Sequence, residues 1–343
     1  QQIEQLIKET GRREFHFVDE AAPPAALKAL ALALIERKLR ITWWSNIRFE
    51  EAFSHDLCKL LAASGCIAVT AGLEAASDRL LEKMKKGITV DQTALVAAAF
   101  KEAGIMIHAY LMYGFPSETI QEAVDALERV RQLFHAGLIQ SAFWHRFTTT
   151  AHSPVGLNPK ANGLRILGPT FGGFADNDLI HRDRIGNAPA WLGEGLRRSM
   201  LNFLEGRGLT MDVRQWFDHQ VPEPNVSGTW VRSLLRTSAP TDCLPLERRL
   251  VWLGDRPVLT QQTRHATLTL HGRFADTDIR LSQAQSRWFR TLIQQATPRK
   301  NKSTPYPWLR DAQTGFPGQA DDFTCFLNGD SWKAARAAGL LLV

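Results

Sequence analysis

The sequence predicts an α/β fold in its first half, and three observations support this prediction. Short apolar, strand-like segments alternate with helical patterns over about 150 residues. The strand segments are nearly continuous in apolar character, which is typical of strands covered on both faces. Successive strands begin about 25 to 39 residues apart, a spacing typical of right-handed βαβ units. The sequence therefore predicts a partial TIM-type (βα) barrel of parallel strands, followed by a smaller α+β part.

Five strands and the helices between them follow from local signals. Strands are predicted over residues 15–18, 41–45, 66–73, 105–112 and 138–147. Helices are predicted over residues 24–37, 55–63, 91–103 and 118–136, and a short helix lies between the expected cap Ser77 and Gly87. Gly65 stands where a helix end favours glycine. We expect the helices to cover the outer face of the sheet, with working residues just past the strand ends.

Polar residues follow each predicted strand. They are Asp19 and Glu20, Asn46 and Arg48, Glu74, the segment 114–118, and the segment 148–154. Each has a simpler structural explanation. Asp19 or Glu20 can cap the next helix, Glu74 can pair with a lysine, and Gly114-Phe-Pro can be a tight turn. Their joint placement at one rim favours a functional site.

Three motifs in this order resemble the radical S-adenosylmethionine (SAM) superfamily, most closely the branch with an N-terminal cobalamin-binding domain. They are Phe17-Val-Asp-Glu, then Gly72-Leu-Glu-Ala with Ser77 and Met84-Lys-Lys-Gly, then Met112-Tyr-Gly-Phe-Pro-Ser-Glu-Thr. Ala75 replaces the family's usual serine, and Phe115 and Ser117 depart from its Gly-Leu-Pro-Gly-Glu pattern. The resemblance covers about residues 1 to 160.

The resemblance implies SAM as a cofactor and assigns its contacts. Asp19 or Glu20 would accept from the SAM amino group, Arg48 would meet its carboxylate, and Glu74 would accept from both ribose hydroxyls. Met112 to Gly114 would form the adenine bed, where glycine lets the backbone come close. The predicted cofactor-binding residues are Asp19, Glu20, Arg48, Glu74, Met112, Gly114 and Thr148; no catalytic residue is predicted.

The cysteine motif that defines this family, Cys-x-x-x-Cys-x-x-Cys, is absent from the sequence. Cys58, Cys66, Cys243 and Cys325 are far apart and have no ligand spacing, so no metal ligand is predicted. We expect the ligands of the [4Fe–4S] cluster, and a cobalamin domain if there is one, upstream of Gln1. The chain would then be an N-terminally truncated piece, inactive by itself. His108, His145 and His152 are read as rim or inward-facing residues rather than ligands.

The residues after the partial barrel are predicted to form a second unit. We place a boundary at residues 157 and 158, with residues 1–157 as the partial barrel and 158–343 as an α+β extension of winged-helix-like type. Residues 168–178 resemble the loop that follows the barrel in cobalamin-type members. Helices are predicted over 192–205 and 283–295, a strand over 266–270, and an irregular stretch over 221–243.

The sequence leaves several functions open. The first hypothesis is a cobalamin-associated radical SAM enzyme that transfers a methyl group or forms a ring. The others are a methylthiotransferase-like enzyme acting on RNA, and a cluster-free descendant that binds SAM or a partner. An unspecified small-molecule or peptide substrate and a flavodoxin- or ferredoxin-like electron donor are expected.

Composition and charge limit the classes of partner that we expect. The net charge of +6 is spread along the chain, which disfavours a nucleic-acid partner. No apolar run approaches the roughly 18 residues of a membrane span, so no membrane partner is expected. No signal peptide is recognised, so the cytoplasm is the expected location.

Overall fold

The computed structural model describes residues 1–170, 176–237, 246–300 and 304–343. Its largest sheet has five strands in the order β1-β2-β3-β4-β5, and every neighbouring pair is parallel. The strands are β1 (Glu14–Phe17), β2 (Thr42–Ile47), β3 (Cys66–Glu74), β4 (Met106–Tyr113) and β5 (Ser141–Arg146). The predicted parallel five-stranded sheet of a partial barrel is therefore confirmed.

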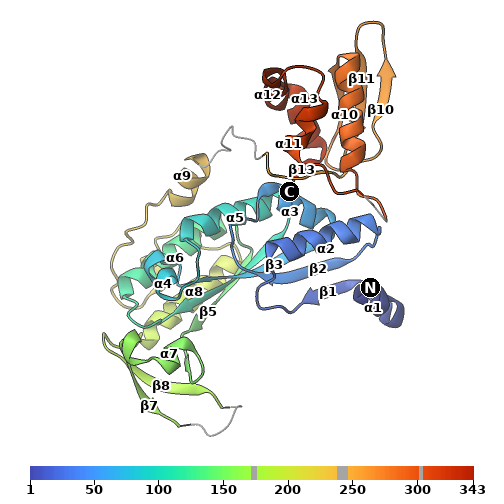
Figure 1. Cartoon of the computed structure of the whole chain (residues 1–343). Coiled ribbons are helices and arrows are strands. Elements are labelled where there is room, and N and C mark those ends of the chain that lie inside the picture. The colour runs from blue at the N-terminus through green and yellow to red at the C-terminus, as the bar shows by residue number, and fades with distance from the viewer. Residues whose placement is uncertain (171–175, 238–245, 301–303) are drawn as a thin grey trace.

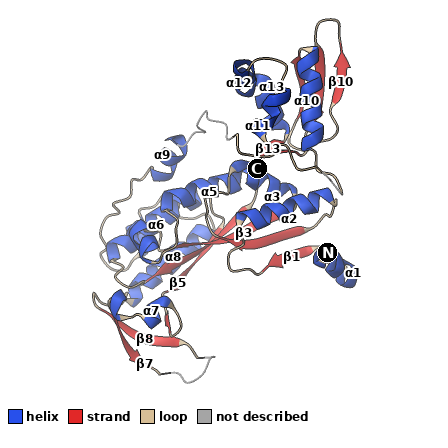
Figure 2. Cartoon of the chain, in the orientation of Figure 1, coloured by secondary structure: helices blue, strands red, loops and turns tan. Residues whose placement is uncertain are grey.

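Helices lie on one face of this sheet, as Figure 1 and Figure 2 show. They are α2 (Pro24–Glu36), α3 (His55–Ala63), α4 (Asp78–Lys83), α5 (Val90–Glu102) and α6 (Ile120–His135), preceded by α1 (Gln2–Thr10) and joined on the sheet's β5 side by α8 (Ala190–Leu204). Trp43, Ser45 and Ile47 of β2 face the helices and are buried, whereas the residues between them are partly exposed. The expectation that both faces are covered is therefore wrong for the described residues.

Three of the helices on this sheet begin at a side-chain cap, whereas the cap predicted at Ser77 does not form. The side chains of Ser54, Thr89 and Thr119 each accept a hydrogen bond from a backbone amide of the first turn. Ser77 makes no such cap. Its hydroxyl donates instead to Glu122 Oε1 at 3.1 Å, which links the start of α4 to α6.

A second, antiparallel sheet follows β5 and was not predicted. It has the order β6-β8-β7 and consists of β6 (Thr149–Thr150), β8 (Asp178–Asp183) and β7 (Leu164–Gly168). Between β6 and β7 lie α7 (Pro154–Leu157) and the 3₁₀ turn η1 (Lys160–Asn162). The predicted loop 168–178 connects β7 to β8, and its residues 171–175 lie outside the described residues.

The C-terminal part is α+β, as predicted. Its three-stranded antiparallel sheet consists of β10 (Val258–Gln261), β11 (Ala266–His271) and β12 (Asp276–Leu281). The helical elements that follow are α10 (Gln283–Ala296), α11 (Leu309–Ala312), η3 (Gln313–Gly315), α12 (Ala320–Asn328) and α13 (Asp330–Ala338). The winged-helix label and the boundary at 157 stay predictions.

The stretch 221–243 was predicted as irregular; its residues 238–243 lie outside the described residues, and the remainder contains a helix, α9 (Trp230–Thr237). The 3₁₀ turn η2 (Val213–Trp216) precedes this stretch. Trp230 Nε1 donates to Asp91 Oδ1 of α5 at 2.7 Å, and Val231 is buried. The helix forms because these contacts with α5 and α6 bury its apolar side. No helix of the described residues is long and apolar enough to cross a lipid bilayer.

A two-stranded sheet joins the two hydrophobic cores. It pairs β9 (Leu250–Trp252) with β13 (Leu340–Leu342) in antiparallel register. Val251 and Leu341 belong to the core of the first half, whereas Trp252 and Leu340 belong to the C-terminal core. Because alternate residues of a strand face opposite sides, each core packs on one face of this small sheet.

Asp56 of α3 fixes this junction, and its removal is expected to destabilise the chain. Asp56 Oδ2 accepts from Arg336 Nη2 at 2.6 Å and from the Leu342 amide at 2.7 Å. Asp56→Ala leaves both donors without an acceptor and should lower the free energy of unfolding by about 1–3 kcal/mol. Urea denaturation measures the loss. Glu247→Ala, which breaks the exposed pair with Arg310 (2.7 Å), is the control; an equal loss in both variants would contradict the assignment.

Candidate functional site

The predicted site residues of the first two strands lie at the rim where the parallel strands end. Asp19 and Glu20 follow β1 and are exposed, and Arg48 follows β2 and is also exposed. The Asp19 carbonyl accepts from Asn46 Nδ2 at 3.0 Å, which ties the loop after β1 to the end of β2. In the described part of the chain, no hydrogen bond or ion pair links these three side chains to Glu74.

Glu74 is held against the end of β3 by local backbone geometry. The register between β3 and β4 shifts between Gly72 and Glu74, so Leu73 is an extra, bulged residue. The Glu74 carboxylate folds back over the strand. It lies so close to Gly72 that a Cβ built there would be only 2.2 Å from Glu74 Oε1. Glycine at position 72 therefore leaves the space that the carboxylate occupies.

The backbone at this point is strained. Glu74 has φ 56° and Ala76 has φ 43°, values that residues with a side chain rarely adopt. Such a conformation costs about 1–3 kcal/mol per residue and persists only where the surrounding structure imposes it. The strain is concentrated at the one predicted acidic residue at the end of β3, which favours a functional role for it.

Glu74 also has the lysine partner that the simpler explanation requires. Lys86 Nζ lies 2.8 Å from Glu74 Oε1, and the Glu74 side chain is only 14% exposed. Glu74 Oε2 makes no hydrogen bond or ion pair with the described residues. The pair therefore orients the carboxylate and does not exhaust its capacity to accept hydrogen bonds.

Glu118 shapes the turn after β4. Its Oε2 accepts from the backbone amides of Gly114 and Phe115, the latter at 3.1 Å. Tyr113 O accepts from Phe147 N at 2.8 Å, whereas the Gly114 carbonyl accepts no hydrogen bond within the described residues. Because the Gly114 amide already donates to Glu118, the carbonyl oxygen of Gly114 is the backbone atom left for the predicted contact with adenine.

A polar network braces the loops after β3 and β4. Arg79 of α4 donates to Glu122 Oε2 at 2.7 Å and to the Ser117 carbonyl at 2.8 Å. Lys83 Nζ donates to Ser117 Oγ at 2.9 Å, and the Ser117 amide donates to Asp183 Oδ2 at 2.8 Å. Burial alone would raise the pKa of Glu122, but the hydrogen bonds from Arg79 and Thr119 lower it to about 2. The Glu122 carboxylate therefore stays charged at neutral pH.

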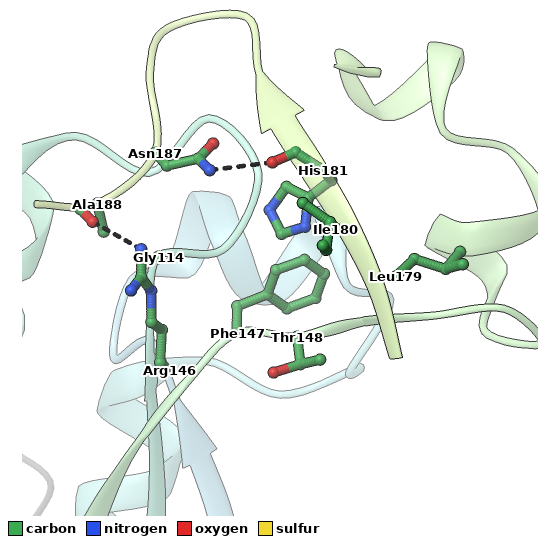
Figure 3. A pocket seen from close by; sticks show the side chains of 9 residues that line it. All are labelled: Gly114, Arg146, Phe147, Thr148, Leu179, Ile180, His181, Asn187 and Ala188. Atoms are coloured by element: carbon green, nitrogen blue, oxygen red, sulfur yellow. Dashed lines mark hydrogen bonds between the residues drawn. The ribbon is translucent and has the colours of Figure 1, made fainter. Parts of the chain in front are cut away.

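A cavity of about 220 Å³ lies beside this turn and is shown in Figure 3. Gly114 and Thr148 line it together with Phe147, His181 and other residues of β8 and the segment after it. Arg146 Nη2 donates to the Ala188 carbonyl at 3.0 Å, and Asn187 Nδ2 donates to the His181 carbonyl at 3.0 Å (Figure 3). The segment 178–188 thus forms one wall of the rim.

The structure brings some predicted residues together and adds others. Gly114 and Thr148 line one cavity, while Met112 does not line it. Lys86 and Glu118 belong to the recognised motifs but were not predicted as site residues; their position in those motifs was the available signal. Asp183, His181 and Arg146 were missed, because nothing in a single sequence indicates that residue 183 contacts residue 117.

The cysteines do not fit an iron–sulfur cluster. Cys58 and Cys66 are buried, and burial raises the pKa of both thiols, that of Cys66 to about 12, so neither forms the thiolate that iron requires. Cys325 is exposed on α12, and Cys243 lies outside the described residues. No group of three His, Cys, Asp or Glu side chains in the described ranges could hold a metal ion, His108 and His145 included.

We expect that the purified chain binds no [4Fe–4S] cluster, because its cysteines have neither the spacing nor the ionisation that ligation needs. Anaerobic reconstitution followed by iron and sulfide analysis checks this. Cys58→Ser with Cys66→Ser serves as the matched control. Stoichiometric iron in the native chain that disappears in the double variant would contradict the expectation.

Glu118 predicts a pH dependence of stability. Burial raises its pKa from 4.5 to about 7, partly offset by the amides of Gly114 and Phe115. Because the folded chain holds this proton more tightly than the unfolded chain, the stabilisation is complete below pH 4.5 and is lost as the pH rises through 7. Relative to Glu118→Gln, the native chain should lose about 1–3 kcal/mol between pH 5 and pH 8.

Urea denaturation at both pH values measures this difference. Glu82→Gln, at an exposed position of α4, is the control and should follow the native chain. If Glu118→Gln shows the same pH dependence as the native chain, the carboxyl of Glu118 does not titrate in this range.

Comparison with known proteins identifies the family of the first part of the chain. Residues 1–130 match the sequence model of the radical SAM superfamily. An uncharacterized methyltransferase of Pyrococcus horikoshii is 29% identical over 130 residues, which is 37% of this chain and 28% of the relative. The anaerobic magnesium-protoporphyrin IX monomethyl ester cyclase of Rubrivivax gelatinosus is 27% identical over 133 residues, 38% of this chain and 24% of the relative.

Among solved structures, the radical SAM methyltransferase TsrM of Kitasatospora setae, with cobalamin and a [4Fe–4S] cluster bound, is similar with a TM-score of 0.45 and 17% identity. It covers 68% of this chain and 53% of TsrM. The chain spans about a quarter of the length of the curated relatives it matches. The family implies SAM and a [4Fe–4S] cluster as cofactors. Residues 1–130, which carry Asp19, Glu20, Arg48, Glu74 and Gly114, belong to the radical SAM superfamily.

Proposed function

We propose that this chain supplies the adenosyl-binding rim of a radical SAM enzyme. The observation that supports this most is Glu74, a carboxylate folded over Gly72 at the end of β3 on a strained backbone. Bound SAM supplies the family's radical-initiating chemistry. The residues of this chain bind and orient the nucleoside part.

The donor set fits an adenosyl group. The two oxygens of Glu74 suit two neighbouring ribose hydroxyls, with charge-assisted hydrogen bonds. The Gly114 carbonyl has no partner among the described residues and suits the exocyclic amine of adenine. Asp19 or Glu20 would accept from the amino group, and Arg48 would pair with the carboxylate; both loops are exposed and open to ligand. Thr148 lines the same cavity as Gly114.

Methyl transfer with cobalamin is the finer form of this proposal. It is supported by the motif resemblance and by a curated relative that is named a methyltransferase. A cluster-free protein that binds SAM or a partner is the second candidate, favoured by the buried, protonated Cys58 and Cys66. A methylthiotransferase-like enzyme acting on RNA has no specific observation in its favour.

The test is calorimetric titration of S-adenosylhomocysteine into the 343-residue chain. We expect saturable binding of one equivalent that 5′-deoxyadenosine competes and inosine does not, since inosine lacks the exocyclic amine. Absence of saturable binding at millimolar ligand, or equal competition by both nucleosides, would contradict the proposal. The same titration does not depend on a cluster, so it separates adenosyl binding from radical chemistry.

A further inference from the structure

The face of the five-stranded sheet opposite the helices carries six ring side chains, which we call the ring face: His16, Trp44, His108, Tyr110, Phe143 and His145. Figure 1 shows the helices on the other side of the sheet. Tyr110 and Phe143 lie on β4 and β5 but are 46% and 55% exposed. Large aromatic side chains on a sheet face keep such exposure only where no other element of the chain covers them.

The rings form two groups on either side of β3. On one side, His16 and Trp44 are stacked, with ring centroids 4.9 Å apart and planes at 14°. On the other, Tyr110 lies 5.8 Å from His145, and Phe143 lies 4.7 Å from His145. His108 extends this second group, 5.2 Å from Tyr110, and its Nδ1 is 2.7 Å from Ser141 Oγ.

Between the two groups β3 presents only small residues. Ala68 is in register with Trp44, Thr70 with His108, and Gly72 with Tyr110. Paired residues of neighbouring strands point to the same face, so this strip of small side chains lies between the rings of β2 and those of β4. The strip leads directly to Gly72, over which the Glu74 carboxylate is folded.

The ring face is also uncharged along this strip. The non-ring residues in register with the rings are all uncharged: Ala68, Thr70, Gly72, Met112 and Ser141. Burial, and then the neighbouring His145, lower the pKa of His108, which keeps its imidazole neutral at pH 7. The five strands carry two carboxylates, Glu14 at the start of β1 and Glu74 at the end of β3. A surface of polarisable rings without fixed charge complements an uncharged, flat ligand rather than a phosphate or a polyanion.

We infer that the ring face binds the substrate of the proposed enzyme, and that this substrate carries a flat, uncharged aromatic ring system. The ring system lies over Ala68, Thr70 and Gly72, between Trp44 and the Tyr110–Phe143–His145 group. Its identification as substrate rests on the proposed adenosyl site, because Glu74 lies at the end of the same strip. Phe143 and Tyr110 are then specificity-determining residues.

The experiment uses two neutral probes of matched shape, 2-naphthalenemethanol and its fully saturated decahydro analogue, titrated into the chain and followed by saturation-transfer NMR. We expect the aromatic probe to bind at least about fivefold tighter. Tyr110→Leu and Phe143→Leu should each weaken it about two- to tenfold. Phe274→Leu removes a similarly exposed ring (46%) of the C-terminal part and should change nothing. Circular dichroism checks that each variant is folded.

Equal binding of the two probes would overturn the inference, as would an equal loss in Phe274→Leu and Phe143→Leu. Binding that vanishes on dilution together with a change of oligomeric state would also overturn it, because a second copy of the chain would then cover the face. Titration with S-adenosylhomocysteine separates the two proposals: aromatic binding without nucleoside binding refutes the adenosyl site and leaves the aromatic site standing.

Discussion

Glu74→Gln is expected to weaken the binding of S-adenosylhomocysteine about ten- to a hundredfold. The carboxylate accepts two charge-assisted hydrogen bonds from the ribose in the proposed site, and the amide offers one neutral acceptor in their place. Hydrogen bonds to a charged group contribute about 1.5–3 kcal/mol, which corresponds to that range of affinity. Isothermal titration of the two chains measures the ratio.

Lys86→Met is the matched control for this variant. Among the described residues, Lys86 is the only charged partner of Glu74, and its side chain is 36% exposed. If Glu74 does no more than pair with Lys86, both variants should lose the same stability, below about 1 kcal/mol, and neither should lose affinity. If Glu74 binds the ribose, Lys86→Met should retain most of the affinity that Glu74→Gln loses.

Gly72→Ala is expected to reduce nucleoside affinity as much as Glu74→Gln does, with the carboxylate still present. The new Cβ would lie 2.2 Å from Glu74 Oε1, a distance that forces the carboxylate off the strand. The obstructing atom is the end of a flexible side chain, so the stability should change by less than about 1 kcal/mol. Titration and urea denaturation together measure both quantities.

Gly228→Ala is the control for this substitution, because a Cβ there meets nothing within 4 Å. A Gly72→Ala chain that keeps the native affinity would show that the position of the Glu74 carboxylate does not matter to the ligand. A chain that unfolds instead would show that the strand, rather than the side chain, cannot accommodate alanine.

The parallel sheet could be predicted from the sequence because its signals are local. The helix over residues 55–63 begins at its Ser54 cap and ends before Gly65, and both signals are present in the sequence. Glu74 and Gly114 could be placed at the rim because parallel strands end on the same side. Ser77 was misassigned because its hydroxyl reaches Glu122, 45 residues away.

The uncovered face could not be predicted in the same way. Trp44, Tyr110 and Phe143 are strand-forming residues whether or not another layer covers them, so the strands look buried on both sides. Helix α9 was missed because Pro222, Pro224 and Gly228 precede it and hide its short apolar pattern. The wall at 178–188 depends on a contact between Asp183 and Ser117, which only the folded chain shows.

The most direct test of the adenosyl site combines Glu74→Gln with a ligand that lacks the ribose 2′-hydroxyl. S-(2′-deoxyadenosyl)homocysteine should bind the native chain about tenfold more weakly than S-adenosylhomocysteine, because one hydrogen bond to the carboxylate is lost. In the Glu74→Gln chain the two ligands should bind within about twofold of each other, since the partner of that hydroxyl is altered. An unchanged tenfold preference in the variant would contradict ribose binding by Glu74.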